Sequence, residues 1–210
     1  MKKLIALTLC AMLLMASASL ARPAFGVKAG VAFSKQTFDY TDFEPGFDTR
    51  AGFQFGFFLE YPVNRYFSLV PEFRYVPVGV KYSIVYVQES GYVGGPVSET
   101  RKTRVDYLSV PLMIKARLPL EKFTPYLIAG PRVDFQLGTG ADAGDFSQVY
   151  DQFDQITAGF TFGGGVQFKL SPRYNLLFEA SYSPDVTKVY ETDLLSIRNH
   201  TLSIVTGVTF

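Results

Sequence analysis

Residues that could catalyse acyl transfer are sparse in this chain. His200 is the only histidine, and Ser203 follows three positions later. A hydrolase or acyltransferase needs a base beside its nucleophile and an acid that orients the base. Residues an odd number of positions apart on a strand point to opposite faces, so His200 meets neither Thr201 nor Ser203 within one strand. We therefore expect no catalytic residues and interpret His200 as a histidine at the rim of the fold.

Metal and nucleotide chemistry find no support in the motifs either. Cys10 is the only cysteine, so no Cys/His cluster predicts zinc. The run Gly163-Gly164-Gly165 lies inside an alternating stretch with no following helix, which favours strand bending over a nucleotide loop. The formal net charge is +1, which gives no electrostatic reason to expect nucleic acid as a partner. We expect no cofactor and no built-in metal site.

Two polar segments, 37–48 and 142–154, interleave acidic with aromatic residues. Clustered acids can bind divalent cations, and aromatic rings supply contact area for a partner. Two interpretations stay open: a solvated rim with some interfacial aromatics, and a contact surface for a protein or for a glycolipid bridged by divalent cations. The residues around which that contact surface would be built are Asp39, Tyr40, Asp42, Phe43, Asp145, Tyr150 and Asp154.

Alternation of apolar with small or polar residues organises the rest of the chain. The clearest stretch runs from Ala51 to Tyr61 and places Phe53, Phe55 and Phe57 on one face. Such period-2 alternation predicts strands with one greasy face. The predicted strands are 26–34, 51–61, a third that starts near 67, 103–117, 127–138, 160–170, 174–184 and 201–210. The third changes phase at Pro77-Val78-Gly79, which predicts a bulge.

The connections between these strands alternate in length. Short ones are expected at 62–65, 118–122 and 171–173, and long ones at about 35–50, 85–102, 139–155 and 185–198. Short turns at one end, long loops at the other and an even strand number are typical of a bacterial outer-membrane barrel. We therefore predict an all-β fold: a transmembrane antiparallel up-and-down β-barrel of about eight strands.

Both ends of the chain agree with export to the outer membrane. Lys2 and Lys3 precede an apolar run, 4–15, that is too short to span a bilayer and is followed by small residues. We interpret residues 1–21 as a cleaved signal peptide and residues 22–210 as the barrel domain. The last strand ends on Phe210, which we interpret as a signal for the barrel-assembly machinery.

The apolar face of each strand is expected to face lipid. A soluble lipocalin-like barrel would turn this face inward. The interior of an eight-stranded barrel is only just wide enough for its side chains, so the many bulky residues could not all fit there. Charges on the inner face would be costly unless paired, so we expect them to pair and to fill the lumen. The predicted lumen ionic network comprises Lys28, Glu60, Glu72, Arg74, Lys115, Arg117, Arg132, Asp134, Lys169 and Glu179.

Several segments resemble the PorT-like outer-membrane β-barrel domain family. They are Phe25–Gly30, Pro71–Tyr75, Tyr107–Pro111, Pro125–Pro131 and the terminal aromatic strand. The resemblance covers essentially the whole chain after the expected signal peptide and implies an eight-stranded outer-membrane barrel. PorT itself is associated with secretion of surface proteins, but no matched residue carries that role to this chain.

These observations favour a non-enzymatic outer-membrane barrel with a filled lumen, long extracellular loops and a structural or interaction role. The alternative is a transport component, either a narrow porin-like channel or an accessory barrel of a secretion system. A lipid-modifying enzyme fits less well, because no catalytic triad is found. The expected partners are outer-membrane lipid, the barrel-assembly machinery during insertion, and a protein or glycolipid at the extracellular loops.

Overall fold

The computed structural model describes residues 23–40, 48–87, 96–102, 104–139, 155–187, 190–191 and 195–210. The expected signal peptide lies outside these ranges, and so do most residues of the two acidic segments. None of the described residues belongs to a helix that is long and apolar enough to cross a membrane. The strands are β1 (Ala24–Tyr40), β2 (Asp48–Pro62), β3 (Phe67–Val78), β4 (Val80–Val87), β5 (Pro96–Lys102), β6 (Val105–Arg117), β7 (Phe123–Thr139), β8 (Ile156–Lys169), β9 (Asn175–Pro184), β10 (Tyr190–Glu191) and β11 (Leu195–Thr209).

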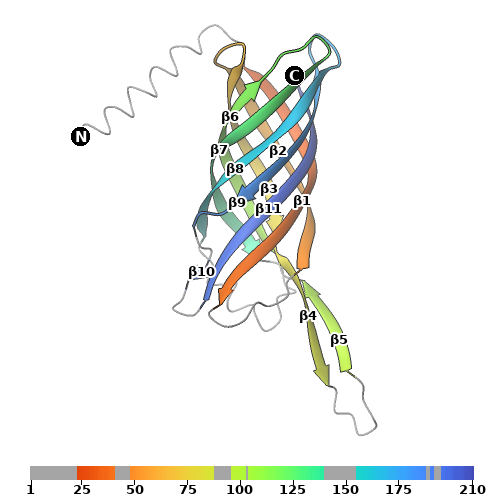
Figure 1. The fold of residues 1–210 in the computed structure, drawn as a ribbon, viewed down its shortest axis with the longest axis vertical. Coiled ribbons are helices and arrows are strands. Elements are labelled where there is room, and N and C mark those ends of the chain that lie inside the picture. The colour runs from red at the N-terminus through yellow and green to blue at the C-terminus, as the bar shows by residue number, and fades with distance from the viewer. Residues whose placement is uncertain are drawn as a thin grey trace, which may run out of the picture.

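Eight of these strands close into an antiparallel barrel (Figure 1). The ring runs β1–β11–β9–β8–β7–β6–β3–β2, and β2 returns to β1. Closure is made by β1, which pairs with β11 from Gly26 to Tyr40 and with β2 from Ala24 to Ser34. A closed ring leaves no unpaired edge to face lipid. The predicted eight-stranded up-and-down barrel is confirmed.

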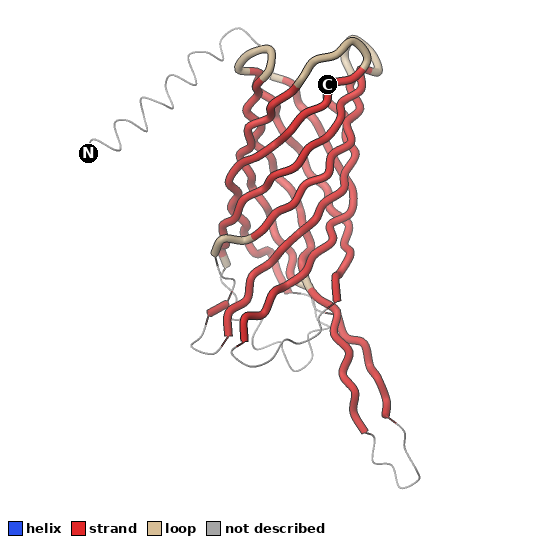
Figure 2. The backbone as a smooth tube through the Cα atoms, viewed as in Figure 1, coloured by secondary structure: helices blue, strands red, loops and turns tan. Residues whose placement is uncertain are grey.

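Short turns lie at one end of the barrel, near the C-terminus (Figure 2). In the turn after β2, the Asn64 side chain accepts hydrogen bonds from the backbone N–H groups of Tyr66 and Phe67, both at 2.8 Å. In the turn after β8, the Ser171 hydroxyl accepts similar hydrogen bonds from the backbone N–H groups of Arg173 and Tyr174. Such side-chain caps allow tight reversals. The short connections are therefore where the sequence predicted them, and this end is the periplasmic one in an outer-membrane barrel.

The opposite end departs from the predicted boundaries in two ways. The first long connection is shorter than expected, because β1 continues to Tyr40, with Asp39 and Tyr40 paired to the start of β11. The segment expected as a loop at 85–102 contains most of a hairpin, in which β4 and β5 pair from Lys81 to Val87. This hairpin extends well beyond the barrel (Figure 1). Backbone hydrogen bonds between β4 and β5 hold these strands together outside the lipid. No lipid-facing side is needed there, so the sequence does not have to alternate between apolar and polar residues.

The predicted bulge at Pro77-Val78-Gly79 takes a different form. Alternation is lost there, since Val76, Pro77, Val78 and Gly79 are all buried. The strand β3 ends at Val78, and the chain leaves the barrel to form the hairpin. A register shift is found instead in the β6–β7 ladder, between Asp106 and Tyr107.

The orientation of the two faces is as predicted. The rings of Phe53, Phe55 and Phe57 are 49–64% exposed, and they lie on the outer face. Glycine is required on parts of the inner face, because a Cβ at Gly30 or Gly130 would collide with a backbone oxygen of the neighbouring strand. The apolar outer face matches a lipid environment.

Candidate functional site: the charged lumen and its two mouths

The centre of the lumen is crossed by an ion-paired bridge. The Lys28 ammonium group on β1 donates to Glu72 on β3 and, at 2.8 Å, to Glu179 on β9. The Arg74 guanidinium lies 3.5 Å from the second Glu72 oxygen, and the Tyr126 hydroxyl donates to Glu179 at 3.1 Å. In the eight-stranded ring, β3 and β9 are four strands apart in either direction. The bridge therefore joins opposite walls of the barrel.

A second cluster lies toward the periplasmic end. The Glu60 carboxylate accepts from Lys115 at 2.8 Å, from Arg117 at 3.1 Å and from the Ser68 hydroxyl at 3.0 Å. The Lys115 nitrogen also donates to Gln167 on β8 at 3.1 Å. It lies 4.2 Å from the centre of the Tyr126 ring, so this cluster contacts the central bridge.

A third cluster lies toward the extracellular end. The Arg132 guanidinium on β7 donates to two carboxylates, Asp134 on the same strand and Asp185 just beyond β9. Asp185 also accepts from the backbone N–H of Asn199 at 3.2 Å. Burial raises the pKa of Asp185 to about 6, and Asp134 adds to this shift, whereas Arg132 and Asn199 oppose it. Two carboxylates thus share one guanidinium group in a buried setting.

Uncharged groups connect the clusters. Arg74 donates to the Thr161 hydroxyl at 3.4 Å, and Thr161 shares a hydrogen bond with Ser183 at 2.9 Å. The Ser203 hydroxyl donates to Gln54 at 3.2 Å. Side chains from all eight barrel strands therefore meet in the lumen, and we call the charged members of the three clusters the lumen network: Lys28, Glu60, Glu72, Arg74, Lys115, Arg117, Arg132, Asp134, Glu179 and Asp185.

One predicted member of the network is placed elsewhere. Lys169 is exposed, and no ion pair among the described residues includes it. It is the last residue of β8, so its side chain lies at the periplasmic mouth rather than inside the barrel. This part of the prediction was wrong. At the end of a strand, a side chain on the inward-facing side is no longer covered by the barrel wall and is open to solvent.

Two important lumen residues were missed by sequence reasoning. Asp185 was assigned to a loop, and Tyr126 was not considered. Both continue the inward phase of their strands: Asp185 follows the buried Ser181 and Ser183, and Tyr126 precedes the buried Arg132 by an even number of positions. Extending the period-2 pattern to the strand ends would have found them.

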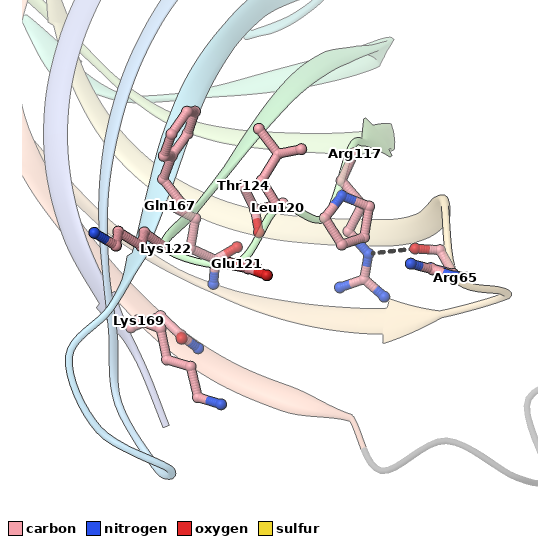
Figure 3. Close-up of a pocket in the computed structure, with 11 residues that line it drawn as sticks. Arg65, Arg117, Leu120, Glu121, Lys122, Thr124, Gln167 and Lys169 are labelled. Atoms are coloured by element: carbon pink, nitrogen blue, oxygen red, sulfur yellow. Dashed lines mark hydrogen bonds between the residues drawn. The ribbon is translucent and has the colours of Figure 1, made fainter.

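The periplasmic mouth contains a cavity of about 360 Å³ (Figure 3). Its lining includes four basic residues, Arg65, Arg117, Lys122 and Lys169, and one acidic residue, Glu121. These side chains come from the turn after β2, from the end of β6 and the turn that follows it, and from the end of β8. The mouth is therefore strongly cationic.

His200 lies apart from the two hydroxyl residues that follow it. The Tyr182 hydroxyl lies 3.0 Å from Nδ1 of His200, and the two rings stack, while Thr201 and Ser203 are buried on the other face. Among the described residues, no three His, Cys, Asp or Glu side chains are grouped to hold a metal ion.

The predicted loop contact surface is largely beyond the structural description. Asp42, Phe43, Asp145, Tyr150 and Asp154 lie outside the described residues. Asp39 and Tyr40 are described through their backbone pairing in β1. That surface stays a prediction.

The C-terminal residue is held at the periplasmic rim. The Phe210 ring stacks on Phe25 with centroids 5.8 Å apart, and the Phe210 backbone N–H donates to the Phe25 carbonyl at 2.8 Å. Tyr174 meets the same ring edge-on. The contact ties the last strand to the first, and the role of Phe210 in assembly stays a prediction.

Three solved structures illustrate what the chain is similar to. The chain is similar to the structure of Neisserial surface protein A, with a TM-score of 0.47 and 18% identity over 89% of this chain and 99% of that chain. For the outer membrane protein OprG from Pseudomonas aeruginosa, the TM-score is 0.48 and the identity 11%, over 89% and 95% of the two chains. For Ail of Yersinia pestis, in complex with the heparin analogue sucrose octasulfate, the values are 0.41 and 15%, over 90% and 100%.

Family comparison gives the firmer assignment. No curated protein matches the chain. The family model described as outer membrane protein beta-barrel domain matches residues 16–191. The chain therefore belongs to the outer membrane protein beta-barrel domain family and is a protein of the outer membrane.

Proposed function

We propose that this protein is a non-conducting, non-enzymatic outer-membrane barrel that acts through its extracellular surface. The observation that carries the proposal is the bridge across the lumen, in which Lys28 binds carboxylates from opposite walls of the barrel. An ion crossing the barrel would have to separate these buried pairs. Leaving buried charges uncompensated is strongly unfavourable, so the lumen network acts as a plug.

The absence of an enzymatic role is supported by the surroundings of the single histidine. His200 stacks against Tyr182 on the outer face, while the hydroxyls of Thr201 and Ser203 are buried on the inner face. A base and its nucleophile would have to lie within hydrogen-bond reach of each other.

The outer face of the barrel wall contacts lipid, and the lumen is filled by ion pairs. The extracellular end is therefore the part of the protein that is free to bind a partner. The β4–β5 hairpin projects from this end and shares only two residue pairs with the barrel, Asp48 with Lys81 and Thr49 with Val80. Beyond these pairs, the hairpin shares no backbone ladder with any other described strand, so most of its outer edges are open to an extended partner. A protein, or a glycolipid bridged by divalent cations, is the partner we infer for the hairpin and the acidic loops together.

Membership of the PorT-like group is part of the same proposal. It is supported by Phe25–Gly30, Pro71–Tyr75, Tyr107–Pro111 and Pro125–Pro131, which lie on barrel strands β1, β3, β6 and β7. An accessory role in secretion would use the same extracellular surface.

Conductance in planar lipid bilayers tests the plug. We expect no steady current from the wild-type protein. A variant in which Lys28, Glu72 and Glu179 are all replaced by serine removes the bridge and should conduct, which shows that the assay detects an open barrel. Stable channels from the wild-type protein would overturn the proposal and favour a transport role.

Replacing residues 80–102 with a short Gly/Ser turn tests the extracellular surface. The barrel should still assemble, because none of its ring pairings involves β4 or β5 and loop length affects stability only weakly. Crosslinking in intact cells should lose the products that the wild-type protein gives. Unchanged crosslinks in this variant and in variants lacking 41–47 or 142–154 would argue against the proposed extracellular contact surface.

A further inference from the structure

The periplasmic end carries an excess of basic residues. Its short turns and their flanks present Arg65, Lys122, Lys169 and Arg173 to solvent, against the single acidic residue Glu121. No ion pair of the described residues includes any of these five side chains. Basic side chains deep in the lumen are paired, so the mouth differs from the interior.

Three of the unpaired cations border the cavity at the mouth. Arg65, Lys122 and Lys169 line it together with the acidic Glu121 and the neutral polar Gln167 (Figure 3). Its volume of about 360 Å³ is within the range of small-ligand sites. Arg173, in the turn after β8, is equally exposed but does not line the cavity.

The acidic groups at the cavity do not balance its basic ones. Glu121 is the one acidic residue in the lining, against four basic residues. Of these four, Arg117 pairs with Glu60, a carboxylate that Lys115 also binds. A cavity with this excess of positive charge gains most from a ligand with more than one negative group.

The position of the cavity favours a ligand that arrives from the periplasm. Its lining reaches inward to Gln167, whose side chain accepts from Lys115 and donates to Thr209 inside the barrel. We propose that the periplasmic mouth binds a compact polyanion, a molecule with two or more carboxylate or phosphate groups. The ligand's oxygens would replace the water around Arg65, Lys122 and Lys169.

Calorimetric titration of the full barrel with pyrophosphate and citrate tests the proposal. The protein is reconstituted in nanodiscs of zwitterionic phosphatidylcholine at low salt. We expect saturable binding at one site that weakens as salt is added, since exposed charges are screened. Replacing Arg65, Lys122 and Lys169 together by glutamine should weaken binding by about tenfold, as expected from three exposed pairs of modest strength.

Arg173→Gln is the matched control, since it removes one nearby exposed charge that does not line the cavity. It should change the affinity much less than Lys169→Gln does. Retention of the compact barrel is checked for every variant by its altered gel mobility before boiling. An equal effect of the two single variants, or no saturable binding by the wild-type protein, would overturn the proposal.

The same titration in discs that contain phosphatidylglycerol separates two sources of the anionic groups. If the anionic lipid competes with pyrophosphate, and Lys169→Gln removes the competition, a lipid phosphate occupies the mouth. If the lipid has no effect, the ligand is a soluble periplasmic molecule. Either result supports an anion site at this mouth.

Discussion

The periplasmic and extracellular halves of the lumen are both polar, yet they satisfy their polar groups differently. In the periplasmic half, long charged side chains reach across the barrel, as Lys115 does between Glu60 and Gln167. In the extracellular half, several buried side-chain atoms have no hydrogen-bond partner among the described residues. These atoms are Ser109 Oγ, Asp134 Oδ1, Gln136 Oε1, Thr157 Oγ1 and Ser181 Oγ. At the centre, Glu72 Oε2 and Arg74 Nε also lack a hydrogen bond, but they lie 3.5 Å apart as an ion pair.

Side-chain length accounts for part of the difference. Three of the five atoms belong to serine or threonine hydroxyls, which reach little beyond their own strand, whereas lysine, arginine and glutamate can span the gap between walls. Buried polar groups usually find partners, and water supplies them where side chains cannot. Under the proposed function, the plug would be the paired network of the centre and the periplasmic half, and we expect water to complete the hydrogen bonding of the extracellular half.

The largest expected effect comes from removing the cation at the centre. Lys28→Met leaves Glu72 and Glu179 buried without their shared partner. We expect a loss of about 3–5 kcal/mol in the free energy of unfolding, the usual cost of breaking a buried pair from one side. Guanidinium titration of the barrel in lipid vesicles measures it. Lys169→Met, at the exposed mouth, should have little effect, and similar losses in both variants would contradict the comparison.

Stability should also depend on pH through Asp185. Its pKa is raised from 3.8 to about 6, mainly by burial, so between these values the folded protein holds a proton that the unfolded chain releases. Stability therefore falls as pH rises through this window. Each pKa unit is worth about 1.4 kcal/mol, so the loss amounts to about 3 kcal/mol at most.

Unfolding measured between pH 4 and pH 8 tests this dependence. Asp185→Asn keeps an acceptor for the Asn199 backbone but cannot ionise, so its stability should change less over the same range. Parallel pH curves for the two proteins would show that Asp185 titrates normally.

Arg132 tests whether the extracellular cluster is coupled. Replacing Arg132 by leucine leaves two buried carboxylates, whereas replacing Arg132 and Asp185 together removes one of them. We expect the double variant to lose less stability than the single Arg132 variant, with a coupling energy of about 1–3 kcal/mol. A double-mutant cycle measures it, and additive losses would show that the two side chains act independently.

The strands and their faces could be predicted from the sequence, because lipid imposes a strict alternation on every crossing. Phe53, Phe55 and Phe57 marked the outer face, and the alternate residues Gln54 and Glu60 are buried inside. The pairing partners could not be predicted in this way. Which inward residues meet depends on how the strands are staggered around the ring, and that stagger is a property of the closed barrel rather than of any one strand.

Outside the membrane, the alternation of apolar and polar residues no longer identifies strands or their faces. The hairpin of β4 and β5 was expected as a loop because no lipid face enforces alternation there. Asp185 lies just outside β9, and its burial comes from Arg132 and Asn199, which are brought to it by two other strands. The site at the periplasmic mouth was also hidden, since its cations come from two turns and one strand end that are far apart in the chain.

The smallest effect compares two serines, one in each half. Ser68 and Ser181 are both buried on barrel strands, but Ser68 donates to Glu60 at 3.0 Å, whereas the Ser181 hydroxyl has no hydrogen-bond partner among the described residues. Removing a hydrogen bond to a charged group costs about 1.5–3 kcal/mol, so Ser68→Ala should destabilise by that amount. Ser181→Ala removes no protein hydrogen bond and should change the free energy of unfolding by less than about 1 kcal/mol.

The same guanidinium titrations decide between these outcomes. The two substitutions remove the same atom from similar strands, so packing losses largely cancel in the comparison. Equal losses would mean that water holds Ser181 as firmly as a carboxylate holds Ser68, and the two halves of the lumen would then be equally rigid. A larger loss for Ser68 locates the rigid plug in the paired half, where the Lys28 bridge and the Glu60 cluster lie.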